Sequence, residues 1–394
     1  MKKQLLSYEE AKKIVENNET FYEKVVVVNG HKVSLFNYRL SQYSDFINPF
    51  ENSDISGFEL RGLTFVHEED RVKRYLMLNK FFNLNQVPNW QYADVKDYRI
   101  VRVQDKCDGS MVRFLKIGGK LFAKTKMDFE NDQCLMALDA LTRKLNYVSF
   151  VEETLEKDEV AIFELVSPKN RIVLEYPKTE LILLQIRCEK TGSYKDIYSH
   201  ELVHKYGIKT AQNEDIASLD NYMEVSETLE NKEGWVLTLE NSQMLKIKTK
   251  WYRELHGLLT ENLVRENKII EMILTETVDD ALSNIKEDDE RRVYVNQIQD
   301  ALAHHVKEKV NNILSLKNEY NGDRKEFAIK NKNNPLFFFA SRVLDKENAE
   351  EVIYKAVVQY LLDETRRLMA ARKFVLDVLK IEVKNLEEKF GDED

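Results

Sequence analysis

Residues 106–110 read Lys-Cys-Asp-Gly-Ser, and Lys106 is the side chain best placed in this sequence for nucleophilic chemistry. A neutral lysine amine can attack the α-phosphate of a nucleoside triphosphate and hold the nucleotide through a phosphoamide bond. Gly109 would permit a close approach of the backbone to a nucleotide, and Asp108 and Ser110 could orient it. The pentapeptide alone is a weak signal, so its meaning depends on the residues around it.

Two carboxylates and a pair of lysines follow Lys106 in the order that nucleotidyl transfer would require. Glu164 lies in the apolar, strand-like segment AIFELV, where an uncompensated carboxylate is costly to bury. Glu233 opens Glu-Gly-Trp-Val at the start of another predicted strand. Lys246 and Lys248 alternate in Leu-Lys-Ile-Lys, and the two-residue period of a strand directs both amines to one face of a sheet.

More cations flank this set. Lys124 and Lys126 repeat the alternation in Ala-Lys-Thr-Lys, Arg61 stands in Glu-Leu-Arg-Gly, and Lys80 precedes Phe-Phe-Asn-Leu-Asn. Neighbouring cations and a bound metal would favour the neutral, reactive amine of Lys106 and would stabilise a triphosphate and the departing pyrophosphate. Carboxylates would hold magnesium and orient ribose hydroxyls.

Each of these residues also has a structural explanation. Alternating lysines on a strand usually form a solvated face or protect a sheet edge. Arg61 and Lys80, taken alone, cannot be told from ordinary surface residues. It is the ordered combination around Lys106 that favours nucleotidyl transfer over these separate explanations.

The elements that must position these residues fall into two unlike parts. Four of the five prolines and nine of the twelve glycines precede residue 253. Short β-type runs, many bounded by turn signals, are predicted at 24–28, 99–103, 111–115, 160–166, 181–186, 235–239 and 244–247, and helices at 7–17 and 132–146. An α+β domain with antiparallel sheets is therefore predicted over 1–253.

From about residue 255, apolar residues recur at helical spacing. Such spacing occurs in three segments: Val293, Ile298, Leu302 and Val306; Val352, Ile353, Val357 and Leu361; and Leu368, Phe374, Leu376, Leu379 and Val383. The sequence therefore predicts an all-α domain over 254–394.

Composition limits the possible environments and partners. The three cysteines have no metal-ligand spacing and indicate reduced thiols in a cytoplasmic compartment. The N-terminal segment is too polar for a signal peptide, and no apolar run approaches membrane-spanning length. The formal net charge of -9 argues against indiscriminate binding along duplex nucleic acid, although a local basic groove remains compatible with it.

Longer motifs give these residues a family context. The chain resembles the covalent nucleotidyltransferases, and within them the bacteriophage RNA ligase 1 family of single-strand RNA ligases. The resemblance covers most of the first domain. It rests on FNYRLSQYSDF (36–46), ELRGLTF (59–65), KFFNLN (80–85), KCDGS, FELVSPKNRIVLEY (163–176), EGWV and LKIKTKWY (245–252). KFFNLN and PKNRIVLEY are the most specific, because capping enzymes and DNA ligases lack them.

The resemblance implies a role for each matching residue. Lys106 would be the adenylylated nucleophile, Tyr38 would stack near the adenine, and Arg61 and Lys80 would contact the phosphates of ATP. Lys126, Lys246 and Lys248 would line the nucleotide site, and Glu164 and Glu233 match the essential acidic positions. Metal would be held by Glu164, Glu233 and Asp279, the last from the acidic pair that follows the catalytic domain. Contacts with RNA are expected from Lys124, Lys126, Trp251 and Tyr252, with Phe81 and Phe82 either assisting or packing in the core.

The predicted function is ATP- and magnesium-dependent joining of 5′-phosphate and 3′-hydroxyl ends of single-stranded RNA, including circularisation. A cleaved tRNA anticodon loop is one candidate substrate, and the enzyme is expected to act as a monomer without a membrane partner. Two alternatives remain: a capping-type guanylyltransferase that uses GTP, and a non-catalytic RNA-binding protein that retains the scaffold. The second is disfavoured because every catalytic position, from Lys106 to Lys248, is present.

Overall fold

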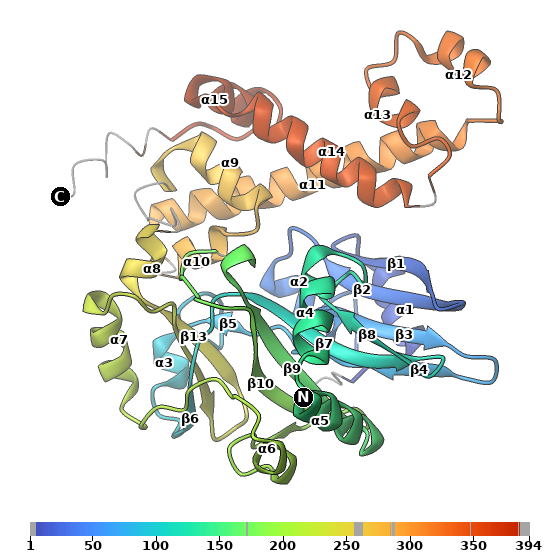
Figure 1. The fold of residues 1–394 in the computed structure, drawn as a ribbon. Helices are drawn as coiled ribbons and strands as arrows, with labels where there is room; N and C mark the ends of the chain where they lie inside the picture. Colours follow the sequence, from blue (N-terminus) through green and yellow to red (C-terminus); the bar gives the residue numbers. More distant parts are fainter. Residues whose placement is uncertain are drawn as a thin grey trace. The chain divides into compact units, whose positions relative to one another are not determined.

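The computed structural model describes residues 5–170, 172–255, 263–283, 285, 288–346, 348–384 and 386. The chain divides into two compact units, Met1–Gly257 and Leu258–Asp394. Among the described residues, strands occur only in the first unit, and the regular elements of the second are helices (Figure 1). The predicted α+β class is confirmed. In the part of the chain that the structure describes, no helix combines the length and apolar character needed to cross a bilayer.

The first unit contains three sheets. The N-terminal sheet has the order β1-β2-β3-β4, the central sheet β11-β10-β9-β7-β8 and the third sheet β5-β13-β12-β6, and only β5 and β13 pair in parallel. The strands are β1 (Phe21–Val28), β2 (His31–Tyr38), β3 (Leu63–His67), β4 (Val72–Tyr75), β5 (Phe82–Asn83), β6 (Ile100–Asp105), β7 (Ser110–Ile117), β8 (Lys120–Lys124), β9 (Glu159–Val166), β10 (Glu180–Cys188), β11 (Tyr194–Lys195), β12 (Gly234–Leu239) and β13 (Met244–Lys248).

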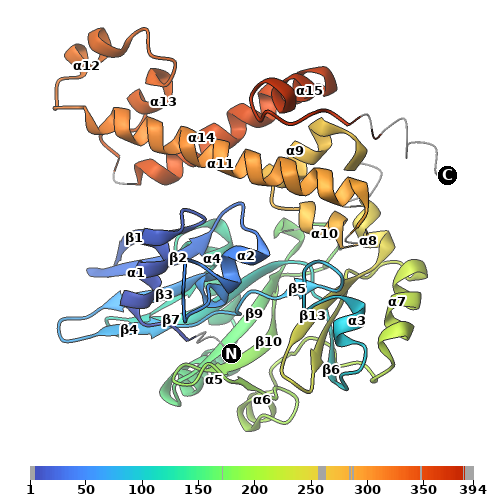
Figure 2. The same cartoon turned by 180° about the vertical axis from the view of Figure 1, so that it is seen from behind.

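Helices cover these sheets on their apolar sides. The helices of the first unit are α1 (Tyr8–Asn17), α2 (Tyr43–Ile47), α3 (Tyr92–Val95), α4 (Asp132–Thr142), α5 (Leu145–Glu156), α6 (Glu201–Tyr206), α7 (Leu219–Thr228) and α8 (Lys250–Leu255), with short 3-10 turns η1 (Phe58–Leu60) and η2 (Pro168–Asn170). One core cluster packs α4, α5 and α6 against β7, β9 and β10, which Figure 2 shows from behind. A second core, rich in aromatic rings, lies beneath the N-terminal sheet.

The segment that carries Lys106 crosses between two of these sheets. β6 ends at Asp105 in the third sheet, and β7 begins at Ser110 in the central sheet. The four residues between them therefore bridge the sheets. A second connection comes from the segment around Ala211, where the amide of Asp105 donates to Gln212 O at 2.9 Å and that of Ala211 donates to Leu183 O at 2.9 Å. The two connections hold together the strands on which the candidate residues lie.

The second unit consists of helices packed around one long element. They are α9 (Glu266–Leu274), α10 (Val278–Leu282), α11 (Glu290–Asn318), α12 (Arg324–Asn331), α13 (Phe337–Ser341), α14 (Ala349–Glu364) and α15 (Leu368–Asp377). α11 buries Ile298, Leu302 and Val306 on one stripe, and α14 buries Ile353, Val357 and Leu361. A buried carboxylate, Glu266, accepts from Arg372 Nε at 3.0 Å and ties α9 to α15.

Several predicted boundaries differ from the structure. The predicted helix at 132–146 is two helices, because the chain turns after α4 and restarts as α5. The third apolar segment of the helical domain ends at Asp377, so Leu379 and Val383 lie beyond α15. The sequence analysis did not predict β2, β3, β4, β5, β8 or β11, whose runs are short or lack a clean alternation. Arg171, within the PKNRIVLEY motif, lies outside the described residues.

Candidate active site

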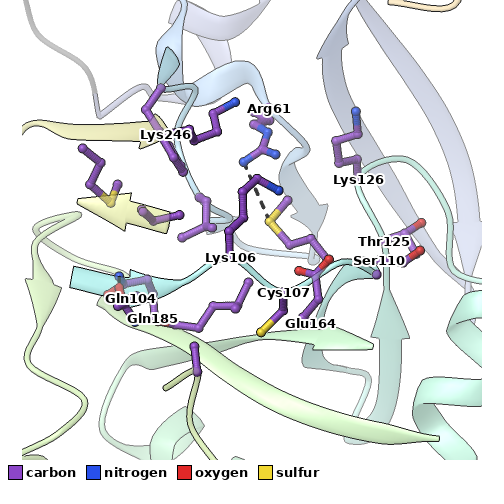
Figure 3. Close-up of a pocket in the computed structure, with 18 of the residues that line it drawn as sticks. Arg61, Gln104, Lys106, Cys107, Ser110, Thr125, Lys126, Glu164, Gln185 and Lys246 are labelled. Carbon is purple, nitrogen blue, oxygen red and sulfur yellow. Dashed lines mark hydrogen bonds between the residues drawn. The ribbon is translucent and has the colours of Figure 1, made fainter. Parts of the chain in front are cut away.

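Lys106 opens onto a cavity of about 520 Å³ in the first unit. This volume lies in the range of small-molecule sites, about 300–1,000 Å³. In Figure 3, Arg61, Lys126 and Lys246 lie around Lys106, with Ser110 and Thr125 toward one end and Gln104 and Gln185 toward the other. Charged groups therefore surround the amine, while uncharged polar groups occupy both ends.

Pairing in the third sheet brings Glu233 to Lys106. Asp105 lies opposite Trp235 in the β6–β12 ladder, and the next amide, that of Lys106, donates to Gly234 O at 3.0 Å. This register places the residue before Gly234 beside the nucleophile. Lys106 Nζ lies 2.5 Å from Glu233 Oε1, and the Glu233 side chain is 2 % exposed.

The same carboxylate contacts the paired-lysine strand. Gly234 lies opposite Lys248 and Val236 opposite Lys246 in the β12–β13 ladder, so the alternation directs both lysines to one face. Lys248 Nζ lies 3.4 Å from Glu233 Oε1. The surroundings of Lys106 are thus mixed, and a carboxylate lies closer to its amine than the cations that were expected to favour its neutral form.

Glu164 approaches the cavity from the central sheet. It lies on β9 opposite Met111 of β7, five residues after the nucleophile, and is 8 % exposed. Burial raises the pKa of its carboxyl to about 8, and the charge of Lys106 acts in the opposite direction. Glu164 therefore holds a proton more tightly in the folded protein than in the unfolded chain.

This proton makes stability depend on pH. An unfolded glutamate titrates near ~4.3, so the contribution of Glu164 is fully present below that pH and is lost as pH rises toward 8. We expect Glu164→Gln, whose amide stays uncharged, to gain stability relative to the parent between pH 5 and pH 8, on the order of a few kcal/mol. Urea unfolding at several pH values measures the difference. A difference that stays constant with pH would contradict the expectation.

The glycine of the pentapeptide is required by packing. A Cβ on Gly109 would lie 2.4 Å from the carbonyl oxygen of Leu165 and 3.2 Å from Glu164 Cγ. Only glycine therefore allows this segment to approach β9 closely enough for the carboxylate of Glu164 to share the cavity with Lys106. Gly109 lines the cavity, but its contact with β9 explains the residue without reference to a nucleotide.

Asp108 is occupied by protein groups. Its Oδ2 accepts from the amides of Val173 at 2.8 Å and Leu174 at 2.7 Å, and its Oδ1 accepts from the hydroxyl of Tyr252 at 2.9 Å. The side chain is 2 % exposed. The expectation that Asp108 orients a nucleotide is therefore corrected: it joins the pentapeptide to the PKNRIVLEY segment and to α8.

Three residues expected at the nucleotide site, Tyr38, Lys80 and Lys248, lie outside the cavity lining. The ring of Tyr38 packs in the aromatic core, 4.8 Å from that of Phe46, and is 8 % exposed. Lys80 Nζ lies over aromatic rings, 5.4 Å from Tyr38 and 5.0 Å from Phe82. Phe82 is buried in the same core, whereas Phe81 lines the cavity beneath Lys246 at 5.2 Å. Stacking of Tyr38 on adenine would need this core to rearrange.

Two residues expected to contact RNA are buried. Lys124 is fully buried, and its amine donates to three backbone carbonyls, so the prediction that Lys124 and Lys126 share one exposed sheet face is wrong. β8 ends at Lys124, and only Lys126 lines the cavity. Tyr252 is 2 % exposed, with its hydroxyl on Asp108, while Trp251 is half-buried. Lys124 and Tyr252 are both too deeply buried in this structure to contact RNA.

The candidate metal ligands separate into two groups. Glu164 and Glu233 lie in the first unit, whereas Asp279 lies half-buried on α10 of the second. Among the described residues, no three acidic, histidine or cysteine side chains cluster as a metal site. One buried atom, Glu233 Oε2, has no hydrogen-bond partner in this part of the chain. Two carboxylates fit magnesium, which commonly takes one or two carboxylates together with substrate phosphates.

Most of the uncharged residues that line the cavity were not predicted from the sequence. Those residues are Leu78, Gln104, Cys107, Met111, Thr125, Asn131, Gln133, Leu184, Gln185, Ala211, Val236 and Met244. Gln104 could have been found from its strand, since it lies two residues before Lys106. Asn131, Gln133 and Ala211 carry no local signal, because only the packing of distant segments brings them to the site.

A family comparison bears directly on this site. A family model described as RNA ligase matches residues 59–252. Residues 59–252 are therefore similar to the RNA ligase family. The matched segment contains Arg61, Lys106, Glu164, Glu233 and Lys246, which are charged residues that the sequence predicted to take part in nucleotidyl transfer.

One curated protein and several solved structures are similar to this chain to different degrees. A curated protein of Thermovibrio ammonificans, whose provisional name is RNA ligase, is 29% identical over 287 residues, which cover 71% of this chain and 72% of that protein. Among solved structures, an archaeal ATP-dependent RNA ligase has a TM-score of 0.46 at 13% identity, covering 86% of this chain and 92% of the other. An RNA ligase of Naegleria gruberi with ATP and Mn has a TM-score of 0.38 at 12% identity, covering 64% and 84%. Both TM-scores lie below 0.5, so these likenesses are distant.

Proposed function

We propose that this protein joins the 5′-phosphate and 3′-hydroxyl ends of single-stranded RNA at the expense of ATP. The observation that carries the proposal is the position of the Lys106 amine, which lies 2.5 Å from Glu233 and borders a cavity of about 520 Å³ that Glu164 also lines. The match of residues 59–252 to RNA ligases supports RNA as the substrate. The resemblance to the single-strand ligases of bacteriophages supports ATP, and it makes RNA repair, including that of a cleaved tRNA anticodon loop, the proposed biological role.

Three nucleotidyl transfers account for the reaction. Lys106 Nζ attacks the α-phosphorus of ATP, the bond to the β-phosphate oxygen breaks, and pyrophosphate leaves. An oxygen of the RNA 5′-phosphate next displaces the lysine, which forms a 5′-5′ pyrophosphate and restores the amine. Finally the RNA 3′-hydroxyl attacks the 5′-phosphorus, and AMP leaves with the seal complete.

The charged residues around Lys106 would have separate tasks in these steps. Arg61, Lys126 and Lys246 are placed to neutralise the phosphates, since all three line the cavity around Lys106. Glu233 Oε1 lies 2.5 Å from Lys106 Nζ and would orient this amine before the attack. The amine would have to leave this contact in order to reach the α-phosphorus. Glu164 and Glu233 would hold magnesium against the phosphates, and the metal would supply additional neutralisation of charge there.

The test is incubation with a 5′-phosphorylated single-stranded RNA, magnesium and either ATP or GTP. We expect ATP to give circles, together with an RNA whose 5′ end carries AMP. A covalent protein label from GTP but not ATP would instead favour a capping-type guanylyltransferase. The absence of label from either nucleotide, with RNA binding retained, would favour the non-catalytic alternative.

A further inference from the structure

Lys124 is a buried cation without a role in the mechanism above. It is the last residue of β8, and its exposed fraction is 0 %. Its Nζ donates to Gly62 O at 3.0 Å, to Thr125 O at 2.7 Å and to Lys126 O at 2.9 Å. An ammonium has three N–H donors, so these three carbonyls satisfy it completely.

The three carbonyls belong to two segments that both reach the cavity. Gly62 follows Arg61, and Thr125 and Lys126 follow β8; Arg61, Thr125 and Lys126 all line the cavity. The side chain of Lys124 therefore links the turn that carries Arg61 to the turn that carries Lys126. The two segments are more than sixty residues apart in sequence, and no strand ladder joins them at this point.

Gly62 shows how closely the turns approach each other. Its φ is +79°, in the left-handed region, and a Cβ there would lie 2.9 Å from Lys126 O and 3.0 Å from Lys126 Cα. The carbonyl of Gly62 can reach the lysine amine only because this residue has no side chain. Burial lowers the pKa of the Lys124 amine, and the charge of Arg113 acts in the same direction.

We propose that Lys124 is a positioning residue that sets Arg61 and Lys126 for the triphosphate of ATP. The inference rests on the proposed function, since it concerns the same cavity. Lys124 touches no part of the cavity itself and acts through the two turns. Its loss should therefore weaken the grip on the phosphates before it affects the attack of Lys106.

ATP–pyrophosphate exchange, which follows the first transfer alone, measures this split between binding and chemistry. We expect Lys124→Met to raise the KM for ATP about 10- to 100-fold with a smaller change in kcat, because displacement of a binding group by about 1 Å can cost that much. A merely structural lysine would instead lower the amount of active enzyme and leave KM unchanged. Lys120→Met, at the exposed start of β8, is the matched control and should keep the KM of the parent.

A double-mutant cycle tests the route of the effect. If Lys124 acts through Arg61, the combined Lys124→Met/Arg61→Ala variant should lose less than the product of the two single losses. Lys124→Gln retains N–H donors and tolerates burial, so its KM for ATP should lie between those of Lys124→Met and the parent. It also provides the same test if the methionine variant does not fold.

The outcomes separate the inference from the proposed function. A parent protein that exchanges ATP with pyrophosphate while Lys124→Met or Lys124→Gln keeps its KM would overturn the positioning role and leave the ligase assignment intact. Strictly multiplicative losses in the cycle would also overturn it. A parent protein that fails to exchange under any condition would count against the proposed function itself.

Discussion

Lys106→Ala is expected to abolish covalent attachment of AMP, a loss of more than about 10³-fold, because no other amine replaces the nucleophile. The amine is held by the β6–β12 register, which places it 2.5 Å from Glu233 and over the cavity. Lys246 and Lys248 have amines nearby, but they project from β13 and do not share this position. The measurement is transfer of label from the α-phosphate of ATP to the protein, followed on a denaturing gel.

Loss of the nucleophile can be distinguished from loss of the fold. The third transfer uses the RNA hydroxyl and not Lys106, so the alanine variant should still seal an RNA that already carries AMP at its 5′ end. Lys120→Ala removes an exposed lysine of the same domain and should label as the parent does. Retention of label in Lys106→Ala, mapped to another peptide, would place the nucleophile elsewhere.

Arg187→Met is expected to destabilise the first unit by about 3–5 kcal/mol. Arg187 on β10 makes a bidentate pair with Glu59 of η1, with Nη2–Oε1 at 2.6 Å and Nη1–Oε2 at 3.0 Å, and both side chains are 3 % exposed. Removing the guanidinium leaves a buried carboxylate without its counter-ion, which costs far more than a pair in water is worth. Because η1 immediately precedes Arg61, nucleotide binding should weaken as well.

Urea unfolding followed by tryptophan fluorescence suits this measurement, because all three tryptophans, Trp90, Trp235 and Trp251, lie in the first unit. Lys205→Met, which breaks the exposed pair with Glu153 at 2.6 Å, should change the stability little because solvent screens the pair, and it serves as the control. Adding Glu59→Gln to Arg187→Met should recover part of the loss, since the unpaired charge is then gone. Equal effects of Arg187→Met and Lys205→Met would show that the buried pair contributes nothing special.

The candidate site could be predicted from local patterns wherever chemistry and alternation coincide in one short segment. The carboxylate within AIFELV and the lysines of Leu-Lys-Ile-Lys each combine a reactive side chain with a strand period that indicates which face it occupies, and KCDGS gives the nucleophile. Their approach to one cavity follows from two sheets joined by the 106–109 segment. The order of the motifs suggested that they act together. No pattern in the sequence, however, shows that residues 106–109 join two sheets.

Other predictions depended on knowing whether a face meets water or another segment. The alternation of Lys124 and Lys126 looked like that of Lys246 and Lys248, yet β8 ends between the first two and the turn at Gly62 covers Lys124. Asp108 looked available to a ligand, but the amides of Val173 and Leu174 reach it from a distant motif.

Residue types and their spacing thus determined by themselves that this chain has an α+β part followed by a helical part, and which lysine and carboxylates are suited to nucleotidyl transfer. Only the tertiary structure decided that Tyr38, Lys124 and Tyr252 are buried and that Glu233 contacts the amine of Lys106. The physical reason is the range of the interactions. Periodicity is set by the backbone over a few residues, whereas burial and ion pairing depend on segments that approach each other only after the chain has folded.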